Sequence, residues 1–209
     1  MPTARDALLD AAHAALSTRP WPAVRMVDVA AVAGVSRQTL YNEFGSKDGL
    51  ARALVRRAAD AYLAGVERAL GTAGGTGDRL AATAAWTVRA TRTDGLLRGL
   101  LTGCWEDRLP HPAHRARPAG SPVPSQRPAD AGPPTPAELL GHVRDRAVAV
   151  LDDGRPPHDP AALAVTCELA LRLALSYALV PPQPGAAGDG APLVREVVER
   201  AADSAAPGC

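Results

Sequence analysis

The sequence predicts an all-α protein of about nine helices, in which a long helix joins a small N-terminal domain to a larger helical domain. Apolar residues recur at every third or fourth position along most of the chain, as one face of an α-helix requires, and no stretch reads as a strand. Residues 47–70 place an apolar residue at every fourth position, and at 1.5 Å per residue this helix is about 36 Å long. A helix of that length can reach from one domain into another.

The N-terminal domain, residues 3–60, is expected to hold three short helices in front of the long one. Pro20-Trp21-Pro22 ends the first helix with a rigid corner, and Trp21 is predicted to fill the base of the small core. Ser36 is placed to cap the third helix, and Ser46 to cap the long one. The predicted helices are Thr3–Thr18, Met26–Ala33, Arg37–Phe44 and Lys47–Leu70.

The larger domain, residues 61–209, contains a proline-rich segment. Residues 110–136 hold nine prolines among polar and small residues, a composition that cannot bury enough apolar surface to order itself, so we expect a mobile loop there. Asp78 is predicted to cap the helix that follows it, and Asp159-Pro160 to start another. The predicted helices are Arg79–Arg92, Leu96–Leu109, Ala137–Leu151, Ala161–Val180 and Pro192–Ala202.

Charge and cysteine content restrict the classes of function. The net charge is only +1, yet residues 1–57 carry eight Lys or Arg against five Asp or Glu, so a mildly basic N-terminal part precedes a mildly acidic remainder. This asymmetry favours a protein that touches nucleic acid with one end. Three cysteines without a C-x-x-C pair favour a reducing, cytoplasmic location. Glu168 and Arg172 interrupt the apolar run 161–180, which argues against a membrane span.

Residues 26–47 have the layout of a helix-turn-helix. Two short helices with apolar faces are separated by Gly34, which can take the left-handed backbone conformation that ends the first helix. Ala30 and Gly34 are expected where the two helices cross, so that a larger side chain would hold them apart. The second helix carries a row of hydrogen-bonding side chains with few acids, as a recognition helix in the DNA major groove does. The alternative interpretation of such a row is a solvated helix surface.

The polar residues of this second helix have different predicted roles. Arg37 and Gln38 lie near its N-terminus, where arginine can pair with guanine and glutamine with adenine. Thr39 can touch a thymine methyl group or a phosphate. Tyr41 and Asn42 are better placed to hold phosphate oxygens, which set register and affinity while base contacts set sequence preference.

The pattern A-x-x-A-G-V-S-x-x-T-L-Y-x-x-F-x-S-K, which runs from Ala30 to Lys47, resembles that of the TetR family of bacterial transcriptional regulators. The resemblance covers about residues 3–60, and the remainder matches only in its helical layout. It implies a homodimeric repressor that leaves a near-palindromic double-stranded DNA operator when a small-molecule ligand binds the helical body. It also implies phosphate contacts by Tyr41 and Lys47, and a groove-facing set of Arg37, Gln38, Thr39 and Asn42.

Two positions depart from the family pattern. The family usually has Ser or Thr directly before the second helix, whereas this chain has Val24-Arg25; losing the cap should cost about 1 kcal/mol, and Arg25 is predicted to reach a phosphate instead. Gly49 lies in the first turn of the long helix, where helix formers are usual, and should weaken it. Lys47 on the same turn adds its charge to the N-terminal amides, which favours an anion. The predicted DNA-binding set is Arg25, Ser36, Arg37, Gln38, Thr39, Tyr41, Asn42 and Lys47.

The larger domain offers a predicted ligand site and a predicted dimer surface. Two tryptophans on adjacent predicted helices could line a cavity for a small molecule, although the alternative is that they fill the core. The last two helices are more apolar than an exposed helix pair, which favours a homodimer interface between two such pairs; a buried core within one chain is the alternative. The predicted ligand-binding residues are Trp86, Arg89, Trp105 and Tyr177.

Catalysis and metal binding are not expected. His111 and His114, near Cys104, Glu106 and Asp107, have the residue types of a metal site, but no rigid frame presents them, so no metal and no cofactor is predicted. The sequence has no nucleophile elbow and no acid pair on one face, so no catalytic residue is predicted either. The competing function is a helical module that binds a ligand or a protein without specific DNA recognition.

Overall fold

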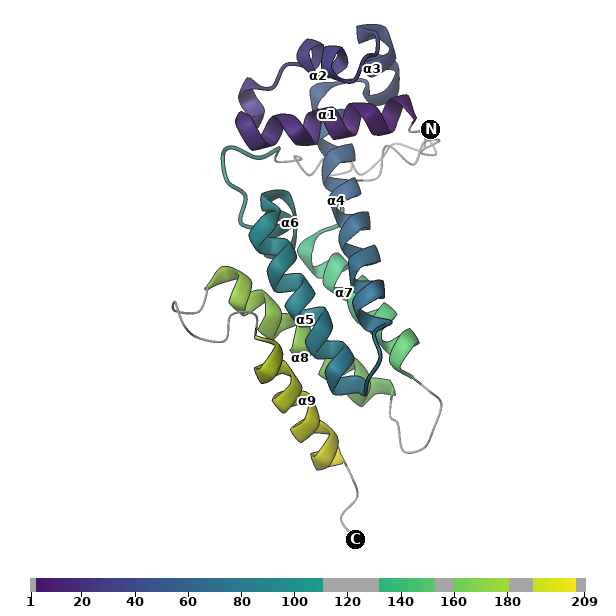
Figure 1. Cartoon of the computed structure of the whole chain (residues 1–209), viewed down its shortest axis with the longest axis vertical. Coiled ribbons are helices and arrows are strands. Elements are labelled where there is room, and N and C mark those ends of the chain that lie inside the picture. Colours follow the sequence, from purple (N-terminus) through teal and green to yellow (C-terminus); the bar gives the residue numbers. More distant parts are fainter. Residues whose placement is uncertain (1–2, 111–131, 153–159, 181–189, 206–209) are drawn as a thin grey trace, which may run out of the picture. The chain divides into compact units, whose positions relative to one another are not determined.

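The computed structural model describes residues 3–110, 132–152, 160–180 and 190–205 (Figure 1). Over these residues the chain forms nine α-helices and one short 3-10 helix, η1, and has no strand, which confirms the predicted all-α class. The elements are α1 (Ala4–Thr18), η1 (Trp21–Ala23), α2 (Met26–Val32), α3 (Arg37–Phe44), α4 (Lys47–Leu70), α5 (Thr76–Thr93), α6 (Gly95–Thr102), α7 (Pro136–Leu151), α8 (Pro160–Leu179) and α9 (Ala191–Ala205).

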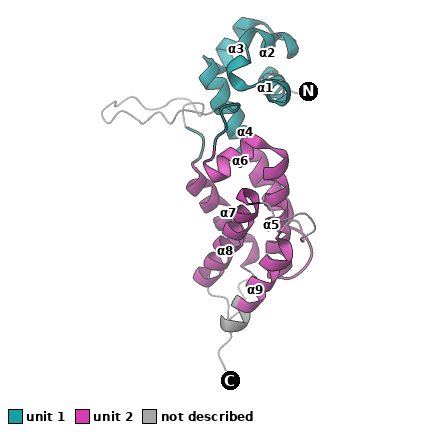
Figure 2. Ribbon diagram, turned by 90° about the vertical axis from the view of Figure 1, so that its left-hand side faces the viewer, with its two compact units in different colours: residues 1–59, 105–134 teal, residues 60–104, 135–209 magenta. Residues whose placement is uncertain are grey.

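The chain divides into two compact units, coloured separately in Figure 2. Unit 1 comprises residues 1–59 and 105–134, and unit 2 comprises residues 60–104 and 135–209, so α4 passes from one unit into the other. These bounds differ in one respect from the expected domains at 3–60 and 61–209, because the segment after α6 joins the N-terminal unit. The backbone N–H of Trp21 donates to the carbonyl oxygen of Arg108 at 2.7 Å, which fixes that segment within unit 1.

Unit 1 is built on α1, which packs against both α2 and α3. Residues at helical spacing turn inward, and Leu8, Ala12 and Leu40 are fully buried. Trp21 is 8% exposed, which confirms its predicted place in this core. The core thereby fixes which face of α3 points outward.

The turn between α2 and α3 corrects one prediction. Gly34 has φ of 68°, which favours glycine, but a Cβ atom placed there would meet nothing within 4 Å. The expectation that Gly34 is needed to bring the helices close together is therefore wrong, because the backbone conformation alone requires it. Ala30 is 2% exposed and lies in the core, and its carbonyl oxygen accepts from the Val35 N–H at 3.1 Å, which closes the turn.

Unit 2 is organised around α5, which packs against α6, α8 and α9, while α7 packs against α6 and α8. Half of the residues of α5 are buried, including three threonines four residues apart, Thr83, Thr87 and Thr91. Each of these hydroxyls donates to the backbone carbonyl four residues earlier at 2.9 Å, so no polar group is left unpaired along this row. The Thr87 hydroxyl also lies 3.0 Å from the Tyr62 hydroxyl of α4, and burial raises the pKa of that phenol to about 12.

Two predicted helix ends in unit 2 are wrong. Helix α5 begins at Thr76, so Asp78 is not its cap; the Asp78 carboxylate instead accepts from the backbone N–H of Gly75 at 3.3 Å, one turn earlier. The helix predicted over Leu96–Leu109 ends at Thr102, because Gly103 takes the left-handed conformation at φ 72° and stops it. Residues 111–131 of the proline-rich segment, Asp159, and Pro181-Pro182 lie outside the described residues.

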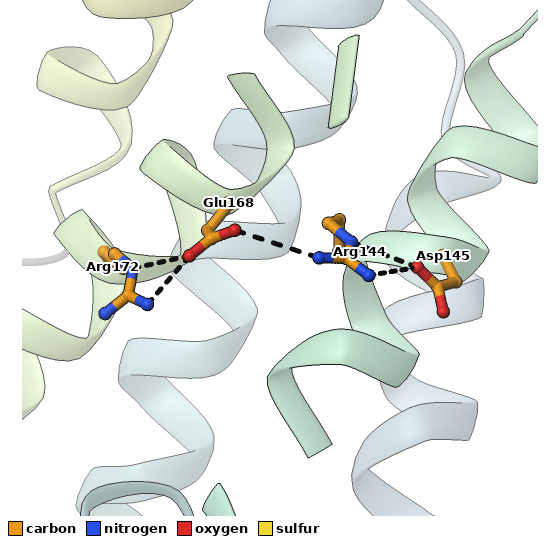
Figure 3. A network of polar contacts seen from close by, with 4 residues as sticks. All are labelled: Arg144, Asp145, Glu168 and Arg172. Carbon is orange, nitrogen blue, oxygen red and sulfur yellow. Dashed lines mark hydrogen bonds and ion pairs between the residues drawn. The ribbon is translucent and has the colours of Figure 1, made fainter. Parts of the chain in front are cut away.

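Helix α8 leaves part of its apolar surface exposed. Val165 is 68% exposed and Leu169 41%, and Leu193 on α9 is 40% exposed. The same helix carries charged groups: the Glu168 carboxylate accepts from Arg172 at 2.7 Å and lies 3.9 Å from Arg144 of α7 (Figure 3). Glu168 and Arg172 can pair because a four-residue spacing places them on one face of the helix.

Candidate nucleic-acid interface

The polar row on α3 faces outward because the opposite side of that helix is held in the core. Leu40 and Phe44, four residues apart, are buried, and Arg37, Gln38 and Asn42 are exposed. Ser36 caps the helix as predicted: its hydroxyl oxygen accepts from the backbone N–H of Thr39 at 3.0 Å. The Ser36 and Thr39 hydroxyls also lie 2.8 Å apart. These two side chains therefore help to fix the start of α3.

Gln38 and Asn42 are already paired in the free protein. The Gln38 amide nitrogen Nε2 donates to the Asn42 Oδ1 at 2.8 Å, along the exposed side of the helix. A glutamine that pairs with adenine uses both its amide nitrogen and its amide oxygen. Gln38 must therefore exchange its bond to Asn42 for one to a base, and Asn42 keeps its own amide N–H groups for a phosphate or a base edge.

Lys47 is held at the edge of the same surface by the corner that precedes α2. Its ammonium Nζ donates to the carbonyl oxygen of Pro22 at 3.1 Å and lies 5.3 Å from the centre of the Trp21 ring. Burial lowers the pKa of the Lys47 ammonium below its ordinary value, and the neighbouring Asp48 carboxylate opposes that shift. Ser46 accepts from the backbone N–H of Gly49 at 3.1 Å, which confirms its predicted capping role.

Arg25 precedes α2 and provides no side-chain cap, in line with the missing Ser or Thr. Its guanidinium instead lies 3.4 Å from the Asp28 carboxylate, which also lies 3.3 Å from Arg19. The Arg25 side chain remains 76% exposed, so it can still reach a phosphate. Asp28 therefore places an acid at the edge of the predicted interface.

The structure adds a basic cleft that the sequence analysis missed. We call it the arginine cleft: Arg5, Arg52 and Arg56 line it together with Tyr41, Asn42 and Glu43 of α3, and its volume is about 210 Å³. The signal in the sequence was the four-residue spacing of the two α4 arginines, which places them on one helix face. That signal does not reveal that α3 and the start of α1 face the same side.

The four predicted ligand-binding residues do not all lie in the same unit. Trp86, Arg89 and Tyr177 belong to unit 2 and Trp105 to unit 1. The Trp86 ring fills the space beside Gly65 of α4, and its indole Nε1 is buried with no hydrogen-bond partner among the described residues. Arg89 is exposed, and the ring of Tyr177 packs beside Gly190. Their role in binding a ligand stays a prediction.

A metal site and a membrane-spanning helix are two further features that the residue types of this chain bring into question. Over the described part of the chain no three metal-ligating side chains gather, and His111 and His114 lie outside it. Helix α8 is long and apolar enough to cross a membrane by length and composition alone, a test that the core helix of a soluble protein also passes. It packs against α5, α7 and α9, and 33% of the apolar window is buried.

An exposed polar helix that follows a capped glycine turn is the arrangement found in helix-turn-helix DNA-binding domains. Residues 8–54 match the family of bacterial regulatory proteins named after tetR. These residues therefore form a DNA-binding domain of the tetR type, as the sequence predicted.

Several known proteins are similar to this chain in sequence or in fold. The HTH-type transcriptional regulator AlkX of Mycobacterium tuberculosis is 50% identical over 66 residues, which span 32% of this chain and only 31% of that protein. The crystal structure of the TetR family repressor AlkX from Dietzia sp. strain DQ12-45-1b has the same fold, with a TM-score of 0.56 and 21% identity over 98% of this chain and 99% of that one. A tetR-family regulator from Streptomyces coelicolor gives a TM-score of 0.54 at 20% identity, covering 97% and 81% of the two chains.

Proposed function

We propose that the protein is a homodimeric repressor that binds a near-palindromic DNA operator through α3 and releases it when a small molecule binds unit 2. The observation that carries this proposal is the outward row of Arg37, Gln38 and Asn42 on a helix whose opposite face is locked in the core. One acid, Glu43, lies on the same helix, and its carboxylate is held by Arg5 at 3.4 Å. The row therefore meets DNA with little like-charge repulsion.

We propose two classes of contact with DNA, one to the base edges and one to the sugar–phosphate backbone. We assign base contacts to Arg37 and Gln38, at the end of α3 that enters the major groove first, each worth about 1–3 kcal/mol of discrimination when bidentate. The remaining side chains contact the sugar–phosphate backbone and set the register. That backbone set is Arg25, Thr39, Tyr41, Asn42 and Lys47, with Ser36 holding the start of the helix.

A second copy of the chain supplies the second half-site. Val165 and Leu169 of α8 and Leu193 of α9 leave apolar area in water, and covering it with the same surface of another copy is favourable at about 25 cal/mol per Å². Glu168 and Arg172 are carried by the same helix as Val165 and Leu169 and pair with each other (Figure 3), so they would form the polar rim of this interface. Two α3 helices would then read half-sites about 34 Å apart, one turn of DNA.

The ligand is expected to enter unit 2. Proteins of this family bind small molecules as well as operators, generally as dimers. In this chain Trp86, Arg89 and Tyr177 supply aromatic area and a cation in that unit, and Trp105 follows α6.

The proposal is tested with the DNA that lies upstream of the protein's own gene. Replacing Arg37 and Gln38 together by alanine should abolish preference for a palindrome in that DNA over random duplex, while weak, salt-sensitive binding remains. Fluorescence anisotropy measures both affinities. A double variant that still selected the palindrome would refute the groove assignment, and a light-scattering mass of one chain for the wild type would refute the dimer.

A further inference from the structure

The arginine cleft lies in unit 1 at the C-terminal end of α3, where the first turns of α4 and the start of α1 meet it. Its residues are Arg5, Tyr41, Asn42, Glu43, Phe44, Gly45, Gly49, Arg52, Ala53 and Arg56. Three arginines and one carboxylate leave an excess of two positive charges. None of the three arginines belongs to the predicted DNA-binding set.

The negative groups of the cleft are already engaged by Arg5. Its guanidinium lies 3.4 Å from both the Glu43 carboxylate and the Glu43 backbone carbonyl oxygen, and 4.7 Å from the centre of the Phe44 ring. Arg5 therefore neutralises the only acid and one of the free carbonyl groups at the end of α3. The charge that remains available comes from α4.

Arg52 is the group best placed to bind an anion. It is half-buried, and within the part of the chain that the structure describes its guanidinium meets no hydrogen-bond or ion-pair partner. Arg56, one turn further along α4, also lines the cleft and adds a second positive charge from that helix. A planar guanidinium presents paired N–H groups that match the oxygens of a phosphate.

We infer that the arginine cleft binds a phosphate of the operator backbone, next along the strand from the phosphate held by Tyr41 and Asn42. Those two side chains are predicted backbone contacts and also line the cleft, so DNA that contacts them lies beside it. Successive phosphates of one strand are spaced by 3.4 Å along the helix axis. The inference rests on the proposed function and extends the DNA contact surface beyond Lys47, further along α4 to Arg52 and to the start of α1.

The test compares the salt dependence of DNA binding for wild type and Arg52→Gln, using the upstream DNA and a random duplex. Losing one phosphate contact should lower the slope of log K against log salt by about 0.9 per bound chain. Between 50 and 200 mM salt the affinity of the variant should then fall about threefold less than that of the wild type, for both DNAs alike. Arg52→Lys should keep most of the slope, and Arg92→Gln, an exposed arginine on α5 of unit 2, is the matched control.

A duplex with single methylphosphonates at each position locates the contact. One substitution beside the Tyr41 phosphate should weaken wild-type binding and have no further effect on Arg52→Gln. An unchanged slope for Arg52→Gln, with a lowered slope for Lys47→Ala, overturns the inference and leaves the proposed function intact. Calorimetric binding of inorganic phosphate that needs Arg52, together with an unchanged DNA slope, assigns the cleft to a free anion and also overturns it. A wild type that binds neither DNA removes the proposed function itself.

Discussion

Helix α4 runs through both units. In each unit it makes a close contact at a glycine and places a cation near a tryptophan ring, but the consequences differ. In unit 1 it places Gly49 against the backbone carbonyl of Phe44, and in unit 2 it places Gly65 against the indole of Trp86. It also sets a cation against a tryptophan ring in each unit: Lys47 lies 5.3 Å from Trp21, and Arg68 lies 5.9 Å from Trp86. The neighbours in unit 1 are backbone and a fixed corner, whereas the neighbour in unit 2 is one large side chain.

This difference shows where the chain has freedom to change. Backbone atoms at the α3–α4 junction cannot move without moving α3, so unit 1 fixes the recognition helix rigidly. A side chain can adopt another rotamer, so the contact between α4 and α5 in unit 2 can adjust. A rigid DNA-reading unit and an adjustable body suit a regulator whose proposed signal enters the body.

The largest effect is expected for Gly49→Ala. A Cβ atom at this position would overlap the carbonyl oxygen of Phe44, so either α3 or the first turn of α4 must shift, at a cost of about 3 kcal/mol, the upper end of the overpacking range. Urea unfolding followed by circular dichroism measures the loss. If Gly49 only weakened the helix through its low helix propensity, alanine would instead stabilise the protein by about 1 kcal/mol. A destabilised variant would therefore show that the expectation from the sequence is wrong.

A smaller loss, about 1–2 kcal/mol, is expected for Gly65→Ala. The added methyl group meets the Trp86 ring, which can rotate away, and alanine recovers part of the cost through its helix propensity. The double variant Gly65→Ala with Trp86→Leu should lose less unfolding free energy than the sum of the losses of the two single variants, because the two residues are in contact. Gly141→Ala on α7 is the control: its Cβ meets nothing within 4 Å, so the variant should be at least as stable as the wild type. Strictly additive losses would contradict the contact.

The smallest effect concerns the two cation–tryptophan pairs. Lys47→Ala should weaken binding to all DNA sequences alike and lower the salt slope by about one unit per bound chain, because one phosphate contact is lost. Arg68→Ala removes the equivalent cation from unit 2 and should leave the slope unchanged. Anisotropy titrations at several salt concentrations compare the two variants. Equal slopes for Lys47→Ala and wild type would remove Lys47 from the phosphate contacts.

The sequence predicted the helix-turn-helix more completely than any other feature, for a local reason. Caps at Ser36 and Ser46, the positive φ of Gly34 and the inward face of Leu40 and Phe44 depend on residues within one or two turns of each other. The same local reasoning misplaced the end of α6. An apolar run continues past Gly103, and the run alone does not show that this glycine takes the left-handed conformation.

The amino-acid sequence by itself therefore determined the all-α class, the DNA-binding domain and the outward row that begins at Arg37, because these follow from periodicity and capping. Only the tertiary structure decided which residues from distant segments share a surface. It brought Arg5, Arg52 and Glu43 to one cleft, and tied the segment at Arg108 to the Trp21 corner. It also showed why glycine occupies positions 49 and 65. At each position a Cβ atom would overlap a neighbouring residue, and the sequence pattern does not reveal that neighbour.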